Sequence, residues 1–96
     1  MTREQCKACV NAGWHGILDR LFEKLGDDGV AAIGQVKEKF GGLRVYFKAS
    51  TDASAQAAVD EAELEAERTC EFCGRVGKAA TTKYGWVKTM CEECTK

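Results

Sequence analysis

The first long apolar pattern in the chain has the spacing of a helix. Its members recur at intervals of three and four: Trp14, Ile17, Leu18, Leu21, Phe22 and Leu25. This spacing places the side chains on one stripe of a helix, so we expect a helix over residues 12–25. It should end at the run GDDG (26–29), because glycine and aspartate accept the backbone conformations that close a helix.

The pattern then changes to one typical of strands. Residues 43–47 (LRVYF) alternate apolar and polar side chains, and an apolar segment at 30–37 precedes them. A β-hairpin is therefore predicted. Its turn should use Gly41 and Gly42, which tolerate positive φ, with the ring of Phe40 covering the turn.

An alanine-rich segment at 55–67 predicts a second helix, with Asp52 among the side chains that can cap its first amides. The apolar face of this helix is narrow and made of small residues. We interpret the opposite face as a solvated surface. Its acidic residues are Asp60, Glu61, Glu63, Glu65 and Glu67.

Two C-x-x-C pairs lie near the C-terminus. Cys70 and Cys73 form one pair, and Cys91 and Cys94 form the other, with seventeen residues between them. This spacing is typical of a zinc ribbon, in which a hairpin brings four thiolates around one Zn²⁺ ion. A site closed by four protein ligands leaves no position for water or substrate, so it predicts a structural role.

The segment between the pairs, residues 81–89, alternates like a strand and places Tyr84, Trp86 and Lys88 on one face. Two interpretations stay open. The aromatic rings can stack on exposed bases while lysines hold phosphates, or they can cover the small ribbon and dock it onto the helices.

A third C-x-x-C pair, Cys6 and Cys9, precedes the first helix. With His15 and Asp19 it offers ligands for a second metal site, or a redox pair of its own. The simpler interpretation gives these residues neither role, because six cysteines cannot build two all-cysteine sites.

Composition narrows the class of protein. The chain has 96 residues, of which 45% are apolar and 30% charged, which is typical of one small globular unit. No apolar run approaches a membrane span, and the polar start MTREQCKAC lacks a secretory signal, so we expect a cytoplasmic protein with reduced thiols. Reduced thiols favour zinc over three disulfides.

Charge is distributed unevenly. Residues 35–48 contain Lys37, Lys39, Arg44 and Lys48 against one acid, whereas residues 52–68 contain six acids against one arginine. The formal net charge is −1, so this is not a generally basic, dedicated nucleic-acid domain. The basic segment nevertheless predicts a surface that attracts a partner through charge.

Four segments in order resemble a family of small, mostly uncharacterised phage and prophage proteins. They are GWHGILDRLFEKL, QVKEKFGGLRVYF, the acidic alanine-rich helix and ERTCEFCGRVG with GWVKTMCEEC, and together they span about residues 9–94. The resemblance implies a GW-led helix, a hairpin and a C-terminal zinc ribbon. It also implies origin in a phage or mobile element and action in the cytoplasm of a bacterial host.

The sequence thus predicts an α+β protein in which residues 1–69 (helix, hairpin, helix) and the zinc ribbon 70–96 pack as one unit. We find no nucleophile and base at motif spacing and no phosphate loop, so no enzyme is predicted. The favoured function is binding to a host protein or nucleoprotein machine, for example as an inhibitor of a bacterial defence system of the anti-CRISPR type. The alternative is a nucleic-acid-binding accessory factor. Both use the same surface: Lys37, Lys39, Arg44, Lys48, Tyr84, Trp86 and Lys88.

Overall fold

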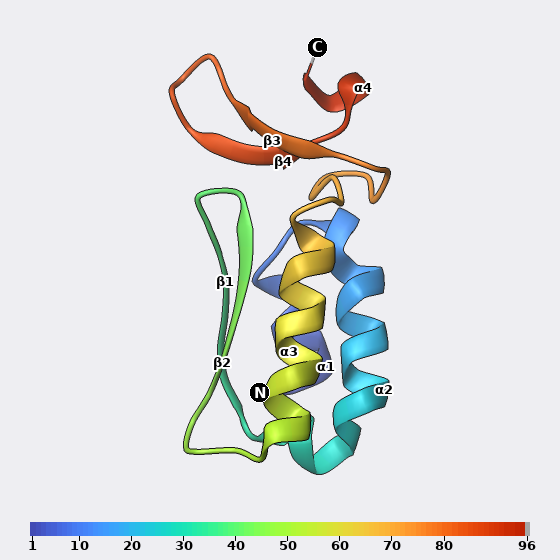
Figure 1. Cartoon of the computed structure of the whole chain (residues 1–96), viewed down its shortest axis with the longest axis vertical. Helices are drawn as coiled ribbons and strands as arrows, with labels where there is room; N and C mark the ends of the chain where they lie inside the picture. The colour runs from blue at the N-terminus through green and yellow to red at the C-terminus, as the bar shows by residue number, and fades with distance from the viewer. Residues whose placement is uncertain (96) are drawn as a thin grey trace.

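The computed structural model, which describes residues 1–95, has the α+β architecture that the sequence predicts. Three helices cover one face of a two-stranded hairpin, and the C-terminal ribbon lies across one end of this body (Figure 1). The molecule is elongated, with extents of 40 × 22 × 21 Å. In chain order the elements are α1 (Arg3–Ala8), η1 (Ala12–Trp14), α2 (His15–Ala31), β1 (Ile33–Lys39), β2 (Gly42–Phe47), α3 (Ala53–Ala66), β3 (Lys78–Thr81), β4 (Val87–Met90) and α4 (Glu92–Thr95).

The predicted first helix is longer than its apolar stripe. It begins with the 3-10 turn η1 and kinks at Gly26, whose φ of 71° breaks the regular helix as the GDDG run suggested. The chain then completes another helical turn up to Ala31. Val30 is therefore buried as part of α2, whereas the sequence placed it in the first strand.

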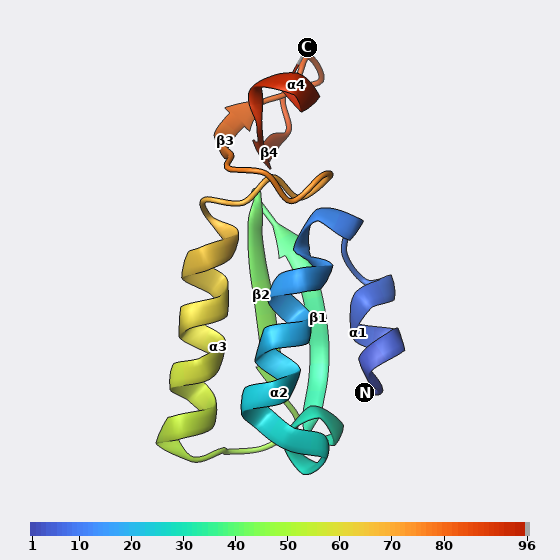
Figure 2. The ribbon, with the colours of Figure 1, turned by 90° about the vertical axis from the view of Figure 1, so that its right-hand side faces the viewer.

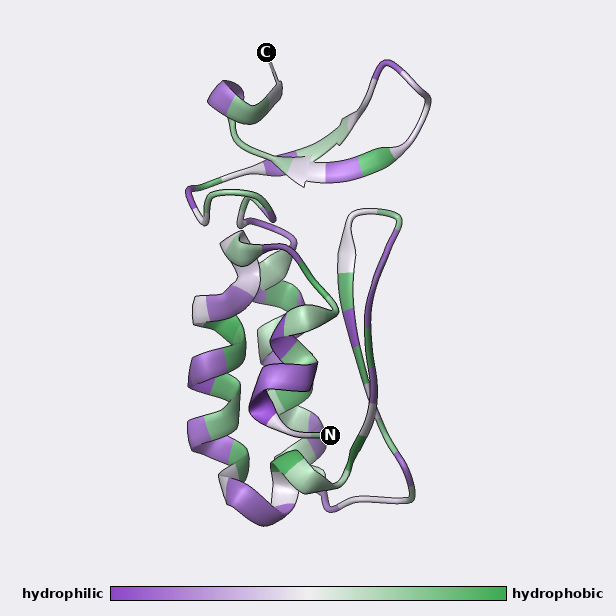
Figure 3. Cartoon of the chain, turned by 180° about the vertical axis from the view of Figure 1, so that it is seen from behind, coloured by the Kyte–Doolittle hydropathy of each residue, from purple (hydrophilic) through white to green (hydrophobic). Residues whose placement is uncertain are grey.

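The core lies between the helices and the inner face of the hairpin. The buried residues of α2 and α3 are apolar, and both helices pack beside the hairpin (Figure 2). Hydrophobic and hydrophilic positions alternate along each of these helices (Figure 3). The fully or nearly buried residues are Cys6, Trp14, Ile17, Leu18, Leu21, Phe22, Val30, Ile33, Val36, Leu43, Val45, Val59, Ala62 and Ala66.

The hairpin turn differs from the prediction. Lys39 pairs with Gly42, so the two-residue loop is Phe40–Gly41, not Gly41–Gly42. Both loop residues have positive φ, 52° for Phe40 and 80° for Gly41. The Phe40 ring does not cover the turn, since 77% of the residue is exposed.

The helix α3 begins as expected, with Asp52 Oδ1 accepting from the amide of Ala55 at 2.8 Å. Its acidic face is less free than expected. The carboxylate of Glu63 accepts from the backbone N–H of Val45 at 3.1 Å, and Glu61 and Glu65 pair with Lys24 and Arg20 of α2. Part of the acidic row therefore joins α3 to its neighbours.

Close backbone contacts hold the ribbon against the end of the body. The amide of Gly13 donates to the carbonyl of Glu71 at 2.9 Å, and Trp14 Nε1 donates to the carbonyl of Thr69 at 2.9 Å. On the hairpin side, Thr89 Oγ1 donates to the carbonyl of Gly41 at 2.6 Å. The ribbon thus touches both the start of the helical layer and the hairpin turn.

We predict that Gly13→Ala strongly destabilises the protein. A Cβ at this position would overlap the carbonyl oxygen of Cys70 and lie 2.7 Å from that of Glu71, so backbone would have to move. The expected loss is at least about 2 kcal/mol in the free energy of unfolding, measured by urea denaturation.

The matched control is Gly16→Ala, in the first turn of α2. There a Cβ meets only Arg20 Nη1 at 3.6 Å, an ordinary contact. Because alanine favours the helix, this variant should gain up to about 1 kcal/mol. Equal stability of the two variants would contradict the close docking of the ribbon.

Candidate metal centre and partner surface

The structure brings the four predicted cysteines together. Cys70 and Cys73 lie in the turn that follows α3, while Cys91 lies between β4 and α4 and Cys94 lies in α4. Their sulfur atoms all lie within 4.8 Å of one another, and those of Cys73 and Cys91 are 3.4 Å apart. Sulfurs bound tetrahedrally to one ion at about 2.3 Å would be about 3.8 Å apart, so the group can hold a metal ion.

Local backbone geometry makes each cysteine pair compact. In the first pair, Gly74 adopts φ 82° and its amide donates to the carbonyl of Cys70 at 2.9 Å. In the second pair the hydroxyl of Thr95 donates to the carbonyl of Cys91 at 3.0 Å, within a single helical turn. The β3–β4 hairpin, with Lys78 opposite Met90, returns the chain so that the two pairs meet.

The thiols differ in how readily they lose a proton. Burial alone would raise the pKa of the Cys70 thiol, but backbone N–H groups of Cys91, Cys73 and Phe72 donate to its sulfur and lower the pKa to about 6. Hydrogen bonding with Cys91 and Cys70 instead raises the pKa of Cys94 to about 12. Four sulfurs this close cannot all be thiolates without a cation between them.

A second metal site at the N-terminal cysteines is not assembled. Among residues 1–95, the four ribbon cysteines are the one group that can hold a metal. Cys6 is buried in the core, and the Cys9 thiol donates to the carbonyl of Gln5. His15 Nε2 lies 2.8 Å from the carbonyl of Lys7, and the Lys7 ammonium pairs with Asp19. These contacts of Cys9, His15 and Asp19 thus lie within the N-terminal part of the chain.

The predicted basic residues share the outer face of the hairpin. Lys37 lies directly opposite Arg44 in the β1–β2 register, and its ammonium lies 5.6 Å from the ring centre of Tyr46. Lys39 continues the row towards the turn, and Lys48 follows the end of β2 with an exposed side chain. We call Lys37, Lys39, Arg44 and Lys48 the basic hairpin face.

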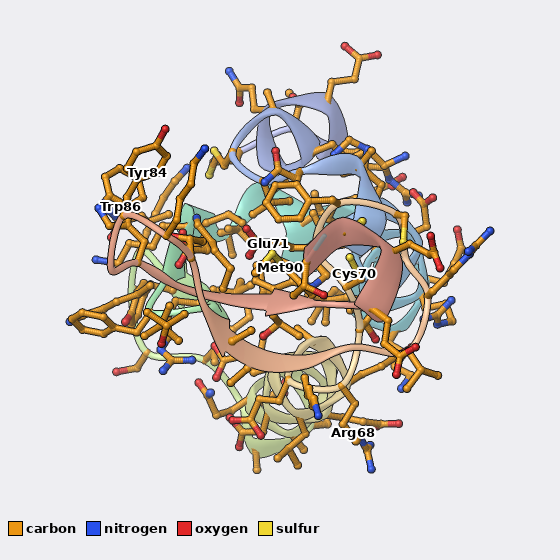
Figure 4. The ribbon with its side chains drawn as sticks, turned by 90° about the horizontal axis from the view of Figure 1, so that it is seen from above. Arg68, Cys70, Glu71, Tyr84, Trp86 and Met90 are labelled. Carbon is orange, nitrogen blue, oxygen red and sulfur yellow. The ribbon has the colours of Figure 1, made fainter. Side chains whose placement is uncertain are left out.

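The predicted strand at 81–89 is wrong in its middle. Residues between β3 and β4 form a tight turn, in which Thr82 Oγ1 accepts from the amides of Tyr84 and Trp86 and Gly85 has φ 82°. Tyr84 is 77% exposed and Trp86 is 66% exposed. Figure 4 shows both rings at the edge of the molecule, far from Cys70. The interpretation that they cover the ribbon or dock it is therefore wrong.

Lys88 is not part of an exposed surface, contrary to its predicted place beside Tyr84 and Trp86. Its ammonium pairs with Glu38 of β1 and lies 3.3 Å from Glu71 Oε1, and its side chain is only 16% exposed. The lysine thus joins the ribbon to the hairpin. Glu38 lies in the QVKEKFGGLRVYF segment and Glu71 lies between Cys70 and Cys73, but neither pattern indicates a pairing with Lys88, because both acids are far from it along the chain.

We call Lys88, Glu38 and Glu71 the junction between the ribbon and the hairpin; burial and pairing shift the pKa of each of these groups. Burial raises the pKa of Glu71 despite the nearby Lys88, and Glu71 Oε2 is buried without a hydrogen-bond partner. Burial alone would lower the pKa of Lys88, but its two carboxylate partners raise it. For Glu38, hydrogen bonds from Lys88 and the Gly41 amide outweigh the effect of burial and lower its pKa. Lys88 is therefore the cation that stabilises both acids.

Comparisons with protein-family models, with curated proteins and with solved structures find no match for this chain. The resemblance to small phage proteins therefore remains a prediction. Within residues 1–95, no helix combines the length and apolar character that crossing a membrane requires.

We predict that Cys73→Ser abolishes stoichiometric metal binding, because it removes one of four ligands from a site that uses all of them. Metal content should fall from one ion per chain to well below one, as measured by elemental analysis after desalting. Cys9→Ser is the control, since this exposed thiol lies outside the cluster. Equal metal loss in both variants, or none in either, would refute the assigned ligand set.

Lys88→Met should destabilise the protein by about 3 kcal/mol, because it leaves the buried Glu71 carboxylate without its cation. Lys83→Met is the control, as Lys83 lies on the exposed ribbon turn. Its expected effect is within about 0.5 kcal/mol. Both are measured by urea unfolding of the metal-loaded protein, and similar values for the two would argue against the junction pairing.

Proposed function

We propose that the ion held by the four cysteines is Zn²⁺ and that its role is structural. A tetrahedral set of four thiolates suits zinc or iron, and zinc is the common choice where no redox chemistry accompanies the site. Zinc binding of this kind contributes roughly 10–16 kcal/mol, which equals or exceeds the net stability of a typical small domain. Elemental analysis separates zinc from iron.

We further propose that the protein is a non-catalytic nucleic-acid-binding protein. The single observation that supports this most is the basic hairpin face, whose outer side carries four cations and no acid between residues 35 and 48. Glu38, the one acid in this range, points to the other side and pairs with Lys88. Cations grouped on an exposed sheet surface attract the phosphates of a nucleic acid.

Net charge does not oppose this proposal. Four thiolates and one Zn²⁺ would bring the formal charge from −1 to −3, but the acids and the cations lie on different elements. Solvent-exposed charges are screened beyond about 8–10 Å at physiological salt, so a bound strand senses mainly the local cations. The local surface, not the total charge, governs binding.

The host-machine hypothesis, including inhibition of a defence system, remains a prediction. A protein that inhibits a nucleic-acid-binding machine can do so by presenting a row of acids that mimics a phosphate backbone, and α3 carries such a row. The contacts of α3 support that mechanism less well, because Glu61, Glu63 and Glu65 already bind groups of the protein itself.

The test replaces Lys37, Lys39 and Arg44 together by glutamine. Binding of a fluorescent oligonucleotide at low salt should weaken at least about tenfold, and the slope of log Kd against log salt should become shallower by up to about 3, since three phosphate contacts are lost. Anisotropy measures both quantities.

The matched control replaces Lys7, Lys24 and Arg68 by glutamine, which changes the net charge equally but leaves the hairpin intact. Its affinity should change less than about threefold. If both triple variants bind alike, or the unmodified protein binds no oligonucleotide, the proposed function fails.

A further inference from the structure

A cleft of about 410 Å³ lies between the hairpin turn and the ribbon turn. Its walls come from two distant parts of the chain, which lie next to each other because the β3–β4 turn extends over the tip of the hairpin (Figure 1). The lining residues are Glu38, Phe40, Gly85, Trp86, Val87 and Lys88. Two largely exposed aromatic side chains, Phe40 and Trp86, thus face one hollow from opposite lobes.

The backbone at Phe40 is unusual for its residue type. A two-residue hairpin loop with positive φ at both positions is normally filled by Asn-Gly or Asp-Gly, because most L-residues are strained there. Phe40 has φ 52° and yet is 77% exposed, so packing within the protein offsets little of the strain, which costs about 1–2 kcal/mol. Backbone strain of this kind occurs often at binding sites, so the strained conformation of Phe40 indicates a binding role for this residue.

Charges around the cleft favour an anionic ligand. The ammonium of Lys39 lies 5.8 Å from the ring centre of Phe40, and that of Lys83 lies 5.2 Å from the ring centre of Tyr84 on the ribbon turn. The one carboxylate in the lining, Glu38, is paired with Lys88 and accepts from the amide of Gly41. Phe40, which lines the cleft, and Tyr84, which precedes the lining residue Gly85, thus each have a lysine ammonium close to the ring.

We propose that this cleft binds an unpaired base of single-stranded nucleic acid. The base stacks against the rings of Phe40 and Trp86, while Lys39 and Lys83 contact the flanking phosphates. The proposal rests on the proposed function and adds to it a preference for single strands, because the bases of a duplex are already stacked inside it. The rest of the nucleic-acid strand then lies along the basic hairpin face, which includes Lys39.

The cleft exists only while the ribbon is docked. Phe40 belongs to the hairpin and Trp86 to the ribbon, and the Thr89–Gly41 hydrogen bond and the Lys88–Glu38 ion pair hold the two together. Removing the metal should therefore abolish the preference for single strands. Residual binding through the basic hairpin face should be equal for single strands and duplexes.

The experiment uses the metal-loaded full chain and two probes, a fluorescent 15-nucleotide oligothymidylate and a duplex of equal length. Phe40→Asn relieves the positive φ, so its melting temperature should rise or stay the same, while its affinity for the single strand should fall about tenfold, the loss of one stacked base. Trp86→Ala should lose a similar factor. The control is Leu64→Ala, an exposed apolar residue on α3, which should change affinity less than twofold.

Tryptophan fluorescence gives an independent signal. Trp14 is fully buried, whereas Trp86 is largely exposed, so quenching on addition of oligothymidylate reports on Trp86. The proposal is supported if quenching is present in the unmodified protein, is lost in Trp86→Ala and is reduced in Phe40→Asn.

Three outcomes would overturn the proposal. They are unchanged single-strand affinity in a folded Phe40→Asn variant, equal affinity of the unmodified protein for the two probes, and absence of quenching during binding. In each of these cases the proposed function still stands if the triple glutamine variant at Lys37, Lys39 and Arg44 loses affinity. Absence of binding to both probes overturns the proposed function together with the cleft.

Discussion

The rest of the structure depends on the clustering of four cysteine sulfur atoms within 4.8 Å of one another. The ribbon has a buried cluster of only Cys70, Met90 and Cys91, with Ala80 and Cys94 packed against it, so apolar packing cannot hold it alone. Strands β3 and β4 and one wall of the cleft belong to this small lobe, as does Lys88, which pairs with Glu38 of the hairpin. Its order therefore sets the position of Lys88, Thr89 and Trp86 relative to the hairpin.

Short-range patterns in the sequence predict much of this fold. The three-and-four spacing before Leu25 identifies the main helix, Asp52 caps α3 as expected, and the two cysteine pairs have the spacing of a ribbon. These signals work because each depends on residues that are close together along the chain or on a fixed ligand geometry.

Contacts between distant segments could not be predicted in this way. Lys88 meets Glu38 fifty residues away, and the pattern of alternation around it looked like an exposed strand face. The sequence places the turn at Gly41 and Gly42 with Phe40 covering it, and only the register Lys39–Gly42 shows that Phe40 occupies the turn itself. The exposure of Trp86 follows from a turn that period-two alternation does not reveal.

The hydrogen bond between the Val45 amide and Glu63 bears on self-association of the protein. A two-stranded hairpin leaves outward N–H groups that another chain can use to extend the sheet. Here the Glu63 carboxylate of α3 accepts from one such N–H group, that of Val45. A strand that paired at this position would have to displace the carboxylate and would place it next to its own backbone without a hydrogen-bond donor. Glu63 therefore disfavours the pairing of a further strand with β2 at Val45.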